Sequence, residues 1–440
     1  MKKKLENRKN NKSIIVSTLI FVITFIAMAG YLIYFNLTQA ESIINNSYNK
    51  RQGVLSRRTI RGSILSDDKT KLAVTNVDDD GNETRYYPYS GLFSHAIGYL
   101  NNGGYGLESL YGYYMLHSNQ NFFEQIGNDL SGNRNTGDNV VTTLNVGLQK
   151  ACYDALGSNR GAVIVMEPST GKILAMVSKP DFDPNTLAAN WSQITGEGSD
   201  SVLVNRATQG LYPPGSTFKL ITMLEYLREH KNDYGQYHYI CDGTYELGNN
   251  TINCVRTTAH GDVDLFSSLA VSCNCSFINI GLSLDLDRYK KTAEKMLFNK
   301  ELPTNLEYNK SRFVLNGESS EWDIAQTSFG QGKTVITPFH LALITCTIAN
   351  NGTLMEPYLV SSVESTNGMT VKKFKEEKYD TLITEKEASL LKKGMEQVVK
   401  DSFSWLFGGV EYTLAAKSGS AQYGTEGYEH SLYASFSPAD

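Results

Sequence analysis

Near the N-terminus, twenty-two consecutive residues from Ile14 to Phe35 carry no charge and are rich in Ile, Val, Phe and Leu. A helix rises about 1.5 Å per residue, so this run would span about 33 Å, enough to cross a hydrocarbon core of about 30 Å. The pattern predicts a transmembrane anchor over residues 14–36. A buried core helix seldom stays uncharged for so long, and the apolar region of a cleaved signal peptide is usually shorter, about 7–15 residues.

The pattern changes twice after the anchor. Residues 37–143 are polar and rich in Tyr, Gly and Asn, with short alternating runs, and they predict a small extended module that we call the pedestal. At residues 139–149 a short strand pattern passes into a helical one. Apolar runs at 161–165 and 173–177, joined by the turn signal Pro168-Ser-Thr-Gly171, then predict a hairpin of buried antiparallel strands.

Helical patterns dominate from Ser216 to about Asn350, and strand patterns return after Gly352 and at 412–416. Strands on both sides of a helical middle are typical of an α+β domain in which one antiparallel sheet is assembled from distant segments. We expect such a domain over residues 144–440.

Charge orients the chain relative to the membrane. Residues 1–12 hold six Lys or Arg and one Glu, residues 36–49 hold no Lys or Arg, and the whole chain of 440 residues has a net charge of -5. The positive-inside rule then predicts a cytosolic basic tail at residues 1–13 and an extracytoplasmic body. An acidic body argues against nucleic-acid binding, and 41% hydrophobic residues exclude a disordered chain.

Six cysteines follow the anchor: Cys152, Cys241, Cys254, Cys273, Cys275 and Cys346. Their spacing matches no familiar zinc pattern, because the Cys-x-Cys pair has no matching partner pair, so we expect no metal site. Cys241 and Cys254 flank a Gly- and Asn-rich stretch. A disulfide between them and six free thiols both remain open.

The sharpest chemical feature is Tyr212-Pro-Pro-Gly-Ser-Thr-Phe-Lys219, which spaces Ser216 and Lys219 three residues apart. On a helix these side chains share a face, and Pro213, Pro214 and Gly215 predict a tight entry that places Ser216 near a helix N-terminus. A serine nucleophile needs a base, which a neutral lysine supplies. The spacing alone is weak, since it recurs elsewhere, for example at Ser66 and Lys69.

Two further motifs make the Ser-x-x-Lys motif at residues 216–219 more specific. Ser272-Cys273-Asn274 supplies a hydroxyl and an amide two residues apart, and Lys417-Ser418-Gly419 ends the apolar run 412–416, on a strand at a sheet edge. A glycine there lets a substrate backbone approach closely. The ordered set, rather than any one motif, is specific.

With this set the sequence resembles the class B penicillin-binding proteins, the serine D,D-transpeptidases that crosslink peptidoglycan. The resemblance covers residues 55–440 and includes Arg58-Thr-Ile-Arg-Gly-Ser-Ile-Leu65, the hairpin at 161–176, Phe329-Gly-Gln-Gly332 and Ala349-Asn-Asn-Gly352. It implies a penicillin-binding, serine β-lactamase-like fold without cofactor. Residues 37–143 are too few for the glycosyltransferase domain of class A members.

The resemblance also implies roles for the residues around the nucleophile. Ser216 would be acylated by a D-Ala-D-Ala donor and Lys219 would be its general base. Ser272 would relay a proton toward the leaving D-alanine, and Asn274 would hold the amide of the donor peptide.

On the strand, Lys417 would supply positive charge that keeps Lys219 partly neutral, and Ser418 would bind the terminal carboxylate of the donor. Gly419 would admit the substrate backbone. The backbone N–H groups of Ser216 and Ser420 would form an oxyanion hole.

The sequence departs from the family after Ser-Pro-Ala-Asp at 437–440, where members continue into another strand and a covering helix, so we expect that sheet edge to be uncovered. Two other functions stay open: a β-lactamase or β-lactam sensor of similar fold, and a non-catalytic scaffold. The partners expected from the resemblance are stem peptides, β-lactams, the membrane through one helix, and a separate polytopic glycosyltransferase of the shape–elongation–division type.

Overall fold

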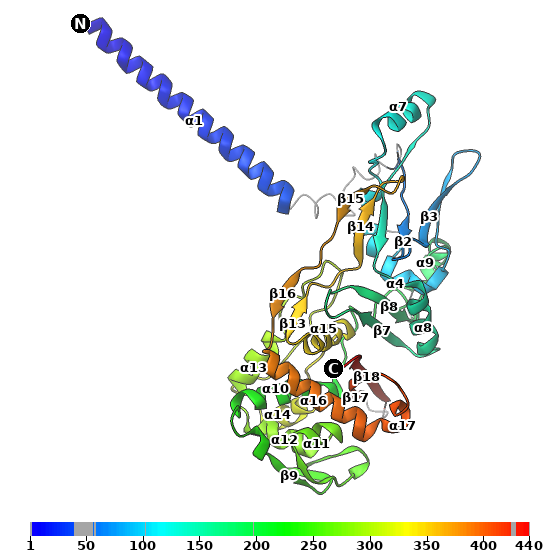
Figure 1. The fold of residues 1–440 in the computed structure, drawn as a ribbon, viewed down its shortest axis with the longest axis vertical. Coiled ribbons are helices and arrows are strands. Elements are labelled where there is room, and N and C mark those ends of the chain that lie inside the picture. The colour runs from blue at the N-terminus through cyan, green and yellow to red at the C-terminus, as the bar shows by residue number, and fades with distance from the viewer. Residues whose placement is uncertain are drawn as a thin grey trace.

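The computed structural model describes residues 2–38, 56, 59–101, 103–196, 198–423 and 428–439. Arg58 and Asp440, which the sequence comparison used, lie outside these residues. The chain begins with one long helix, α1 (Lys2–Thr38), drawn in blue in Figure 1. Within it Lys12–Phe35 is long and apolar enough to cross a membrane, so the predicted apolar helix is present.

The pedestal is built on a six-stranded sheet with the strand order β15-β14-β6-β2-β3-β4. Its strands are β2 (Ile64–Leu65), β3 (Lys71–Val77), β4 (Glu83–Tyr86), β6 (Asn139–Thr142), β14 (Val360–Glu364) and β15 (Thr370–Lys373). The β2–β6 pair is parallel and the other neighbours are antiparallel. Val140 of β6 pairs with Ile64 on one side and with Val363 on the other, and all three side chains are fully buried.

Short elements surround this sheet. They are β1 (Thr59–Ile60), the one-turn helix η1 (Ser90–Phe93), α4 (Ser94–Ile97), α5 (Gly106–Leu110), α6 (Gly112–Met115), α7 (Phe122–Ser131) and β5 (Asn135–Thr136). The strands predicted after Gly352 therefore belong to a different sheet from the one expected. β14 and β15 extend the pedestal sheet rather than the sheet of the C-terminal domain, because an apolar alternation indicates a strand but does not name its partner.

A buried ionic cluster holds the pedestal together. The carboxylate of Glu108, which is fully buried, accepts hydrogen bonds from Arg61 Nε at 2.8 Å and Arg85 Nε at 2.7 Å. Arg85 also donates to the carbonyl of Gly62 at 2.8 Å. Burial alone would raise the pKa of Glu108, but the charges of Arg85 and Arg61 outweigh it and lower the pKa below its usual value. The cluster ties α5 to two segments of the sheet.

The C-terminal domain holds two antiparallel hairpins and a group of helices (Figure 1). The hairpins are β7 (Gly161–Met166) with β8 (Ile173–Lys179), as predicted, and β17 (Ala415–Tyr423) with β18 (Tyr428–Phe436). The helices are α8 (Val146–Leu156), α9 (Leu187–Thr195), α10 (Lys219–Glu229), α11 (Leu265–Ala270), α12 (Asn274–Ser283), α13 (Leu286–Lys295), α14 (Glu321–Ser328), α15 (Pro338–Ala349), α16 (Glu385–Ser402) and α17 (Ser404–Phe407). Helix α15 lies against both β7 and β18, although no ladder joins the two hairpins among the described residues.

Helix α10 runs through the core of this domain. Its first nine residues, from Lys219 to Leu227, are all buried, and the polar Lys219 and Glu225 are buried with the apolar ones. Helix α16 packs against β17, α10 and α11. The predicted α+β domain is confirmed, and its central helix begins at one of the candidate catalytic residues.

One segment expected to be helical forms strands instead. β9 (His238–Cys241), β10 (Thr244–Leu247), β11 (Asn250–Asn253) and β12 (Gly261–Asp264) make two small antiparallel pairs, with a one-turn helix η4 (Val255–Thr257) between them. We call residues 238–264 the strand lobe. The strands are only four residues long and mostly exposed, and so carry little apolar alternation for a sequence pattern to reveal. Two further short strands, β13 (Thr353–Met355) and β16 (Lys378–Thr381), pair beside α13.

Candidate active site

Ser216 lies on a one-turn 3-10 helix, η2 (Gly215–Phe218), directly before α10. Pro214 is its N-cap residue, and Gly215 has φ +54°, a backbone conformation that favours glycine. Residues three apart in a 3-10 turn eclipse one another, so Ser216 and Lys219 share one side. Ser216 is partly exposed, whereas Lys219 is fully buried. The predicted helix entry is therefore present, as a 3-10 turn.

Ser272 and Asn274 lie in the turn that joins α11 to α12. Ser272 has φ +55°, a left-handed conformation that costs a non-glycine residue about 1–3 kcal/mol. The next residue, Cys273, caps α12: its Sγ accepts from the Ser276 N–H at 3.3 Å, and its own N–H donates to the Ser268 carbonyl at 2.9 Å. The turn thus presents the Ser272 hydroxyl, the Ser272 carbonyl and the Asn274 amide together.

All three of these groups contact Lys219. Its Nζ donates to the Ser272 carbonyl at 2.6 Å and to Asn274 Oδ1 at 2.8 Å, and lies 3.2 Å from Ser272 Oγ. Burial lowers the pKa of Lys219 to about 8, and no carboxylate in the described part of the chain acts to restore it. A neutral amine has two N–H groups and one lone pair. The two carbonyl oxygens occupy both N–H groups, which leaves the lone pair to accept a proton.

Lys417 approaches the same hydroxyl from strand β17. It is 1% exposed, and its Nζ donates to Ser272 Oγ at 3.0 Å and to the Ser418 carbonyl at 2.9 Å. Burial lowers the pKa of Lys417 well below its usual value, and the charge of Lys219 lowers it further. The three sequence motifs therefore meet at one oxygen atom, Ser272 Oγ.

Strand β17 passes very close to the turn that carries Ser216. A Cβ added to Gly419 would lie 2.8 Å from the Pro214 carbonyl oxygen and 3.1 Å from the Ser216 nitrogen. A Cβ added to Gly215 would lie 2.9 Å from the Ser420 nitrogen. Only glycine at both positions admits this approach of two backbones. Ser418 is partly exposed and Ser420 is exposed, so both are open to a ligand.

The structure adds a supporting residue whose part the sequence did not indicate. The carbonyl of Gly330 accepts the Gly215 N–H at 2.9 Å, and a Cβ on Gly330 would lie 1.8 Å from the Gly215 carbonyl oxygen. Gly330 has φ +87°. Its segment, Phe329-Gly-Gln-Gly332, was noted only as part of a resemblance. The paired glycines were the one signal of this close approach.

Comparison with known families agrees with this geometry. Residues 161–440 match the penicillin binding protein transpeptidase domain, and residues 61–140 match the penicillin binding protein A dimerisation domain. The first match alone covers more than half of the chain. The limits of the predicted parts, 37–143 and 144–440, stay predictions.

Comparison with individual relatives indicates the same family. The chain is 31% identical to the peptidoglycan D,D-transpeptidase PbpA of Mycolicibacterium smegmatis over 386 residues, which are 81% of this chain and 75% of that protein. Among solved structures, penicillin-binding protein A from M. tuberculosis, in a ceftriaxone acyl-enzyme complex, has 28% identity and a TM-score of 0.79, covering 88% of this chain and 91% of that one. The D,D-transpeptidase domain from Eggerthella lenta has 29% identity and a TM-score of 0.78, covering 87% and 91%. The chain therefore belongs to the class B penicillin-binding proteins.

Proposed function

We propose that this protein is a peptidoglycan D,D-transpeptidase in which Ser216 carries the acyl group from a D-Ala-D-Ala donor to the amine of an acceptor stem peptide. The observation that carries the proposal is the placement of two buried lysines, Lys219 and Lys417, on the hydroxyl of Ser272 beside the turn that carries the partly exposed Ser216. The enzyme is a serine acyltransferase.

In the acylation step the bond from Ser216 Oγ to the donor carbonyl carbon forms, and the C–N bond to the terminal D-alanine breaks. The proton of Ser216 passes to the lone pair of Lys219. The leaving amine takes a proton from the Ser272 hydroxyl, which in turn takes the proton that Lys219 received from Ser216, so that Lys219 is neutral again before the second step. In the second step the acceptor amine attacks the ester carbonyl, its proton passes to Lys219, and Ser216 regains its proton as the ester bond breaks.

Strand β17 supplies the substrate surface. One edge of β17 pairs with β18, and the strand passes close to the Ser216 turn, so a donor peptide added along its other edge would reach the nucleophile. The Ser418 hydroxyl binds the terminal carboxylate, and the Ser216 and Ser420 N–H groups stabilise the oxyanion, by about 3–4 kcal/mol per donor.

Asn274 has a second part besides holding the amide of the donor peptide, which the resemblance implied. Its Oδ1 accepts from Lys219 at 2.8 Å and its Nδ2 donates to the Asn253 carbonyl at 3.0 Å. Both ends of the amide are engaged by the protein, so Asn274 chiefly positions Lys219, and one remaining N–H is left for the donor.

β-Lactams acylate the same serine in this proposal. M. tuberculosis penicillin-binding protein A has been solved as ceftriaxone, imipenem and penicillin G acyl-enzyme complexes, and that likeness supports the assignment. A β-lactamase would share the acylation step and differ in rapid hydrolysis of the ester.

The test uses the full-length protein in detergent, a D-Ala-D-Ala stem-peptide donor and a D-amino acid acceptor. We expect release of D-alanine and formation of the exchanged peptide, both lost in Ser216→Ala. Lys333→Ala, at an exposed lysine, is the control and should keep parental rates. Steady turnover of a chromogenic cephalosporin without peptide exchange would identify a β-lactamase. Failure of the folded parent to turn over either substrate would leave the scaffold function.

We further propose that α1 anchors the protein in the membrane with its N-terminus in the cytosol, and that the anchor and pedestal dock a polytopic glycosyltransferase. The apolar span at Lys12–Phe35 supports the membrane anchor. Its small residues Ala27, Ala29 and Gly30 support a contact between the anchor and the glycosyltransferase. On α7 of the pedestal, Leu130 is 83% and Ile126 is 39% exposed, four residues apart on one helix face.

Two variants test this docking. Replacing residues 14–35 with an unrelated transmembrane helix, or introducing Ile126→Asp with Leu130→Asp, should reduce co-purification of the glycosyltransferase while leaving acylation of Ser216 unchanged. Parental recovery of the partner by both variants would leave α1 as a tether only.

A further inference from the structure

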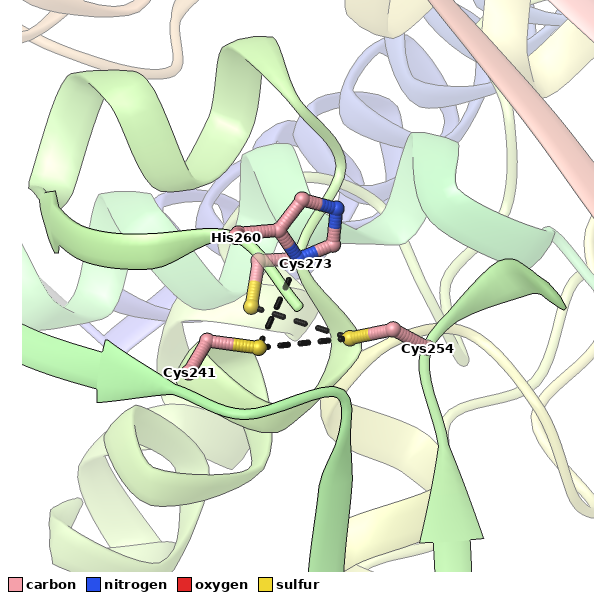
Figure 2. Close-up of side chains that lie close together, drawn as sticks. All are labelled: Cys241, Cys254, His260 and Cys273. Atoms are coloured by element: carbon pink, nitrogen blue, oxygen red, sulfur yellow. Dashed lines mark hydrogen bonds between the residues drawn. The ribbon is translucent and has the colours of Figure 1, made fainter. Parts of the chain in front are cut away.

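Four side chains with metal-binding atoms converge beside the active site, in and next to the strand lobe. They are Cys241 at the end of β9, Cys254 after β11, His260 before β12, and Cys273 between α11 and α12. Their three sulfur atoms and the His260 ring nitrogen lie within 4.8 Å of one another (Figure 2). The three cysteines are buried and the histidine is half-buried.

Three of the six distances between these donor atoms fit one tetrahedral ion, and all six lie within 4.8 Å. With Zn–S bonds of about 2.3 Å and a Zn–N bond of about 2.05 Å, two sulfurs on a tetrahedral zinc lie about 3.8 Å apart, and a sulfur and a nitrogen about 3.6 Å apart. The Cys241–Cys254 and Cys254–Cys273 sulfur distances are both 3.8 Å, and Cys241 Sγ lies 3.4 Å from His260 Nδ1. A disulfide needs about 2.05 Å between its sulfurs. The six cysteines are free thiols here, and these four donors stand at ligand spacing.

Besides its cysteines, the strand lobe buries only two apolar side chains, Ile252 and Val263. Its buried cluster consists of Cys241, Cys254, Cys273 and Cys275, with two half-buried tyrosines packed against them. Apolar residues that would ordinarily fill a core point outward: Ile240 is 80% and Val255 is 69% exposed. A lobe of short strands whose interior is largely sulfur matches the small domains whose folding a structural metal supports.

Backbone strain in the ligand loop is a further sign. Between Cys254 and His260, Arg256 and Thr257 both have left-handed backbones, with φ +57° and +53°. Each such residue costs about 1–3 kcal/mol and persists only where the surroundings over-determine it. Bonds from both ends of the loop to one ion would hold this conformation.

We infer that Cys241, Cys254, His260 and Cys273 form a structural Zn²⁺ site that holds the Ser272–Asn274 turn in its catalytic position. Three thiolates and one imidazole with tetrahedral spacing suit zinc among the common divalent ions. All four positions are protein side chains, as in structural rather than catalytic zinc sites.

The link to catalysis runs through Cys273. It lies between Ser272 and Asn274, the two residues that contact Lys219. The Asn274 amide also donates to the carbonyl of Asn253, the residue before Cys254. Two metal ligands, Cys273 and Cys254, are therefore direct neighbours in the chain of residues that hold Lys219 and Asn274 in place. Metal binding at Cys273 would also fix the strained backbone of Ser272 on its C-terminal side.

The spacing of the cysteines along the sequence led to the expectation of no metal site. The same spacing explains why a sequence pattern does not reveal this site. Its ligands are thirteen, six and thirteen residues apart and occur singly rather than in close pairs. Cys275, whose Sγ lies 3.4 Å from that of Cys254, is a fourth thiol that lies outside the set of three cysteines and one histidine.

Zinc content of the full-length protein, purified in detergent without chelator, tests the site. We expect about one zinc per chain by elemental analysis, and at least about tenfold less in the double variant Cys254→Ser with His260→Asn. Cys152→Ser, at a buried cysteine on α8 in a separate cluster, is the matched control and should keep one zinc. Ser216→Ala should also keep one zinc, which separates this inference from the proposed function.

Two measurements on the parental chain cover the case in which the double variant does not fold. After exchange with Co²⁺, we expect thiolate-to-cobalt charge-transfer bands and the visible bands of tetrahedral cobalt. Removing zinc with a chelator should slow β-lactam acylation at least about tenfold, and adding zinc should restore it. The inference is overturned by a zinc content below about one-tenth per chain with no cobalt bands, by unchanged zinc in the folded double variant, or by a Cys241–Cys254 disulfide in place of metal.

Discussion

The neutral Lys219 amine makes a quantitative prediction about pH. With an ordinary lysine pKa of 10.5, about one amine in 3,000 would be neutral at pH 7, whereas at about 8 the fraction is about one in eleven. Burial in α10 thus provides about 300-fold more of the basic form at pH 7. The titratable groups that face Lys219 are Lys417 on β17 and the thiols of Cys254, Cys273 and Cys275.

Because only the neutral amine accepts the proton of Ser216, the acylation rate constant should follow that fraction. We expect it to rise about ninefold from pH 6 to 7, about fivefold from pH 7 to 8, and less than twofold from pH 8 to 9. Stopped-flow quenching by a fluorescent penicillin measures this rate constant, with circular dichroism to confirm that the fold is unchanged over the range. A flat profile, or a rate that falls between pH 6 and 8, would refute a neutral Lys219 as the base.

Three further predictions follow from individual contacts. Lys219→Ala should lose acylation by about 10²- to 10⁴-fold, whereas Lys417→Arg keeps an N–H donor for Ser272 Oγ and should retain partial acylation; the opposite order in the same assay would exchange their roles. Gly419→Ala forces β17 away from the Pro214 carbonyl, and a displacement approaching 1 Å should slow acylation by about 10²-fold; a parental rate would show that the close approach is not required. Glu108→Ala leaves two buried arginines uncompensated and should cost about 3–5 kcal/mol in urea unfolding, against less than about 1 kcal/mol for Asp154→Asn in an exposed pair; equal losses would contradict the buried-cluster argument.

The sequence alone predicted the candidate catalytic residues but not how they meet. Ser216 and Lys219 are three residues apart, so local helix geometry was enough to place them together. Ser272 and Lys417 are 145 residues apart in the chain, yet Lys417 Nζ lies 3.0 Å from Ser272 Oγ. Only the order of the motifs along the sequence suggested that these two side chains meet. That order carried information because it matched a family, not because any physical rule relates such distant segments.

Two parts of the fold escaped prediction for identifiable reasons. The strands of the strand lobe are short and mostly exposed, and besides cysteines they bury only Ile252 and Val263, so little apolar period marks them. β14 was expected as a strand but in another sheet, because its partner β6 lies more than two hundred residues earlier in the chain. Strand identity is a local property, whereas pairing depends on the whole topology.

The central claim, that Ser216 is the acylated nucleophile, is tested most directly by mass mapping of the penicillin adduct. The full-length protein is incubated with penicillin G, digested, and its peptides are sequenced by mass spectrometry. We expect one penicilloyl group per chain, carried by the peptide with Ser216 and assigned to its side chain, and none in Ser216→Ala. An adduct on any other residue, or undiminished labelling of a folded Ser216→Ala variant, would contradict it.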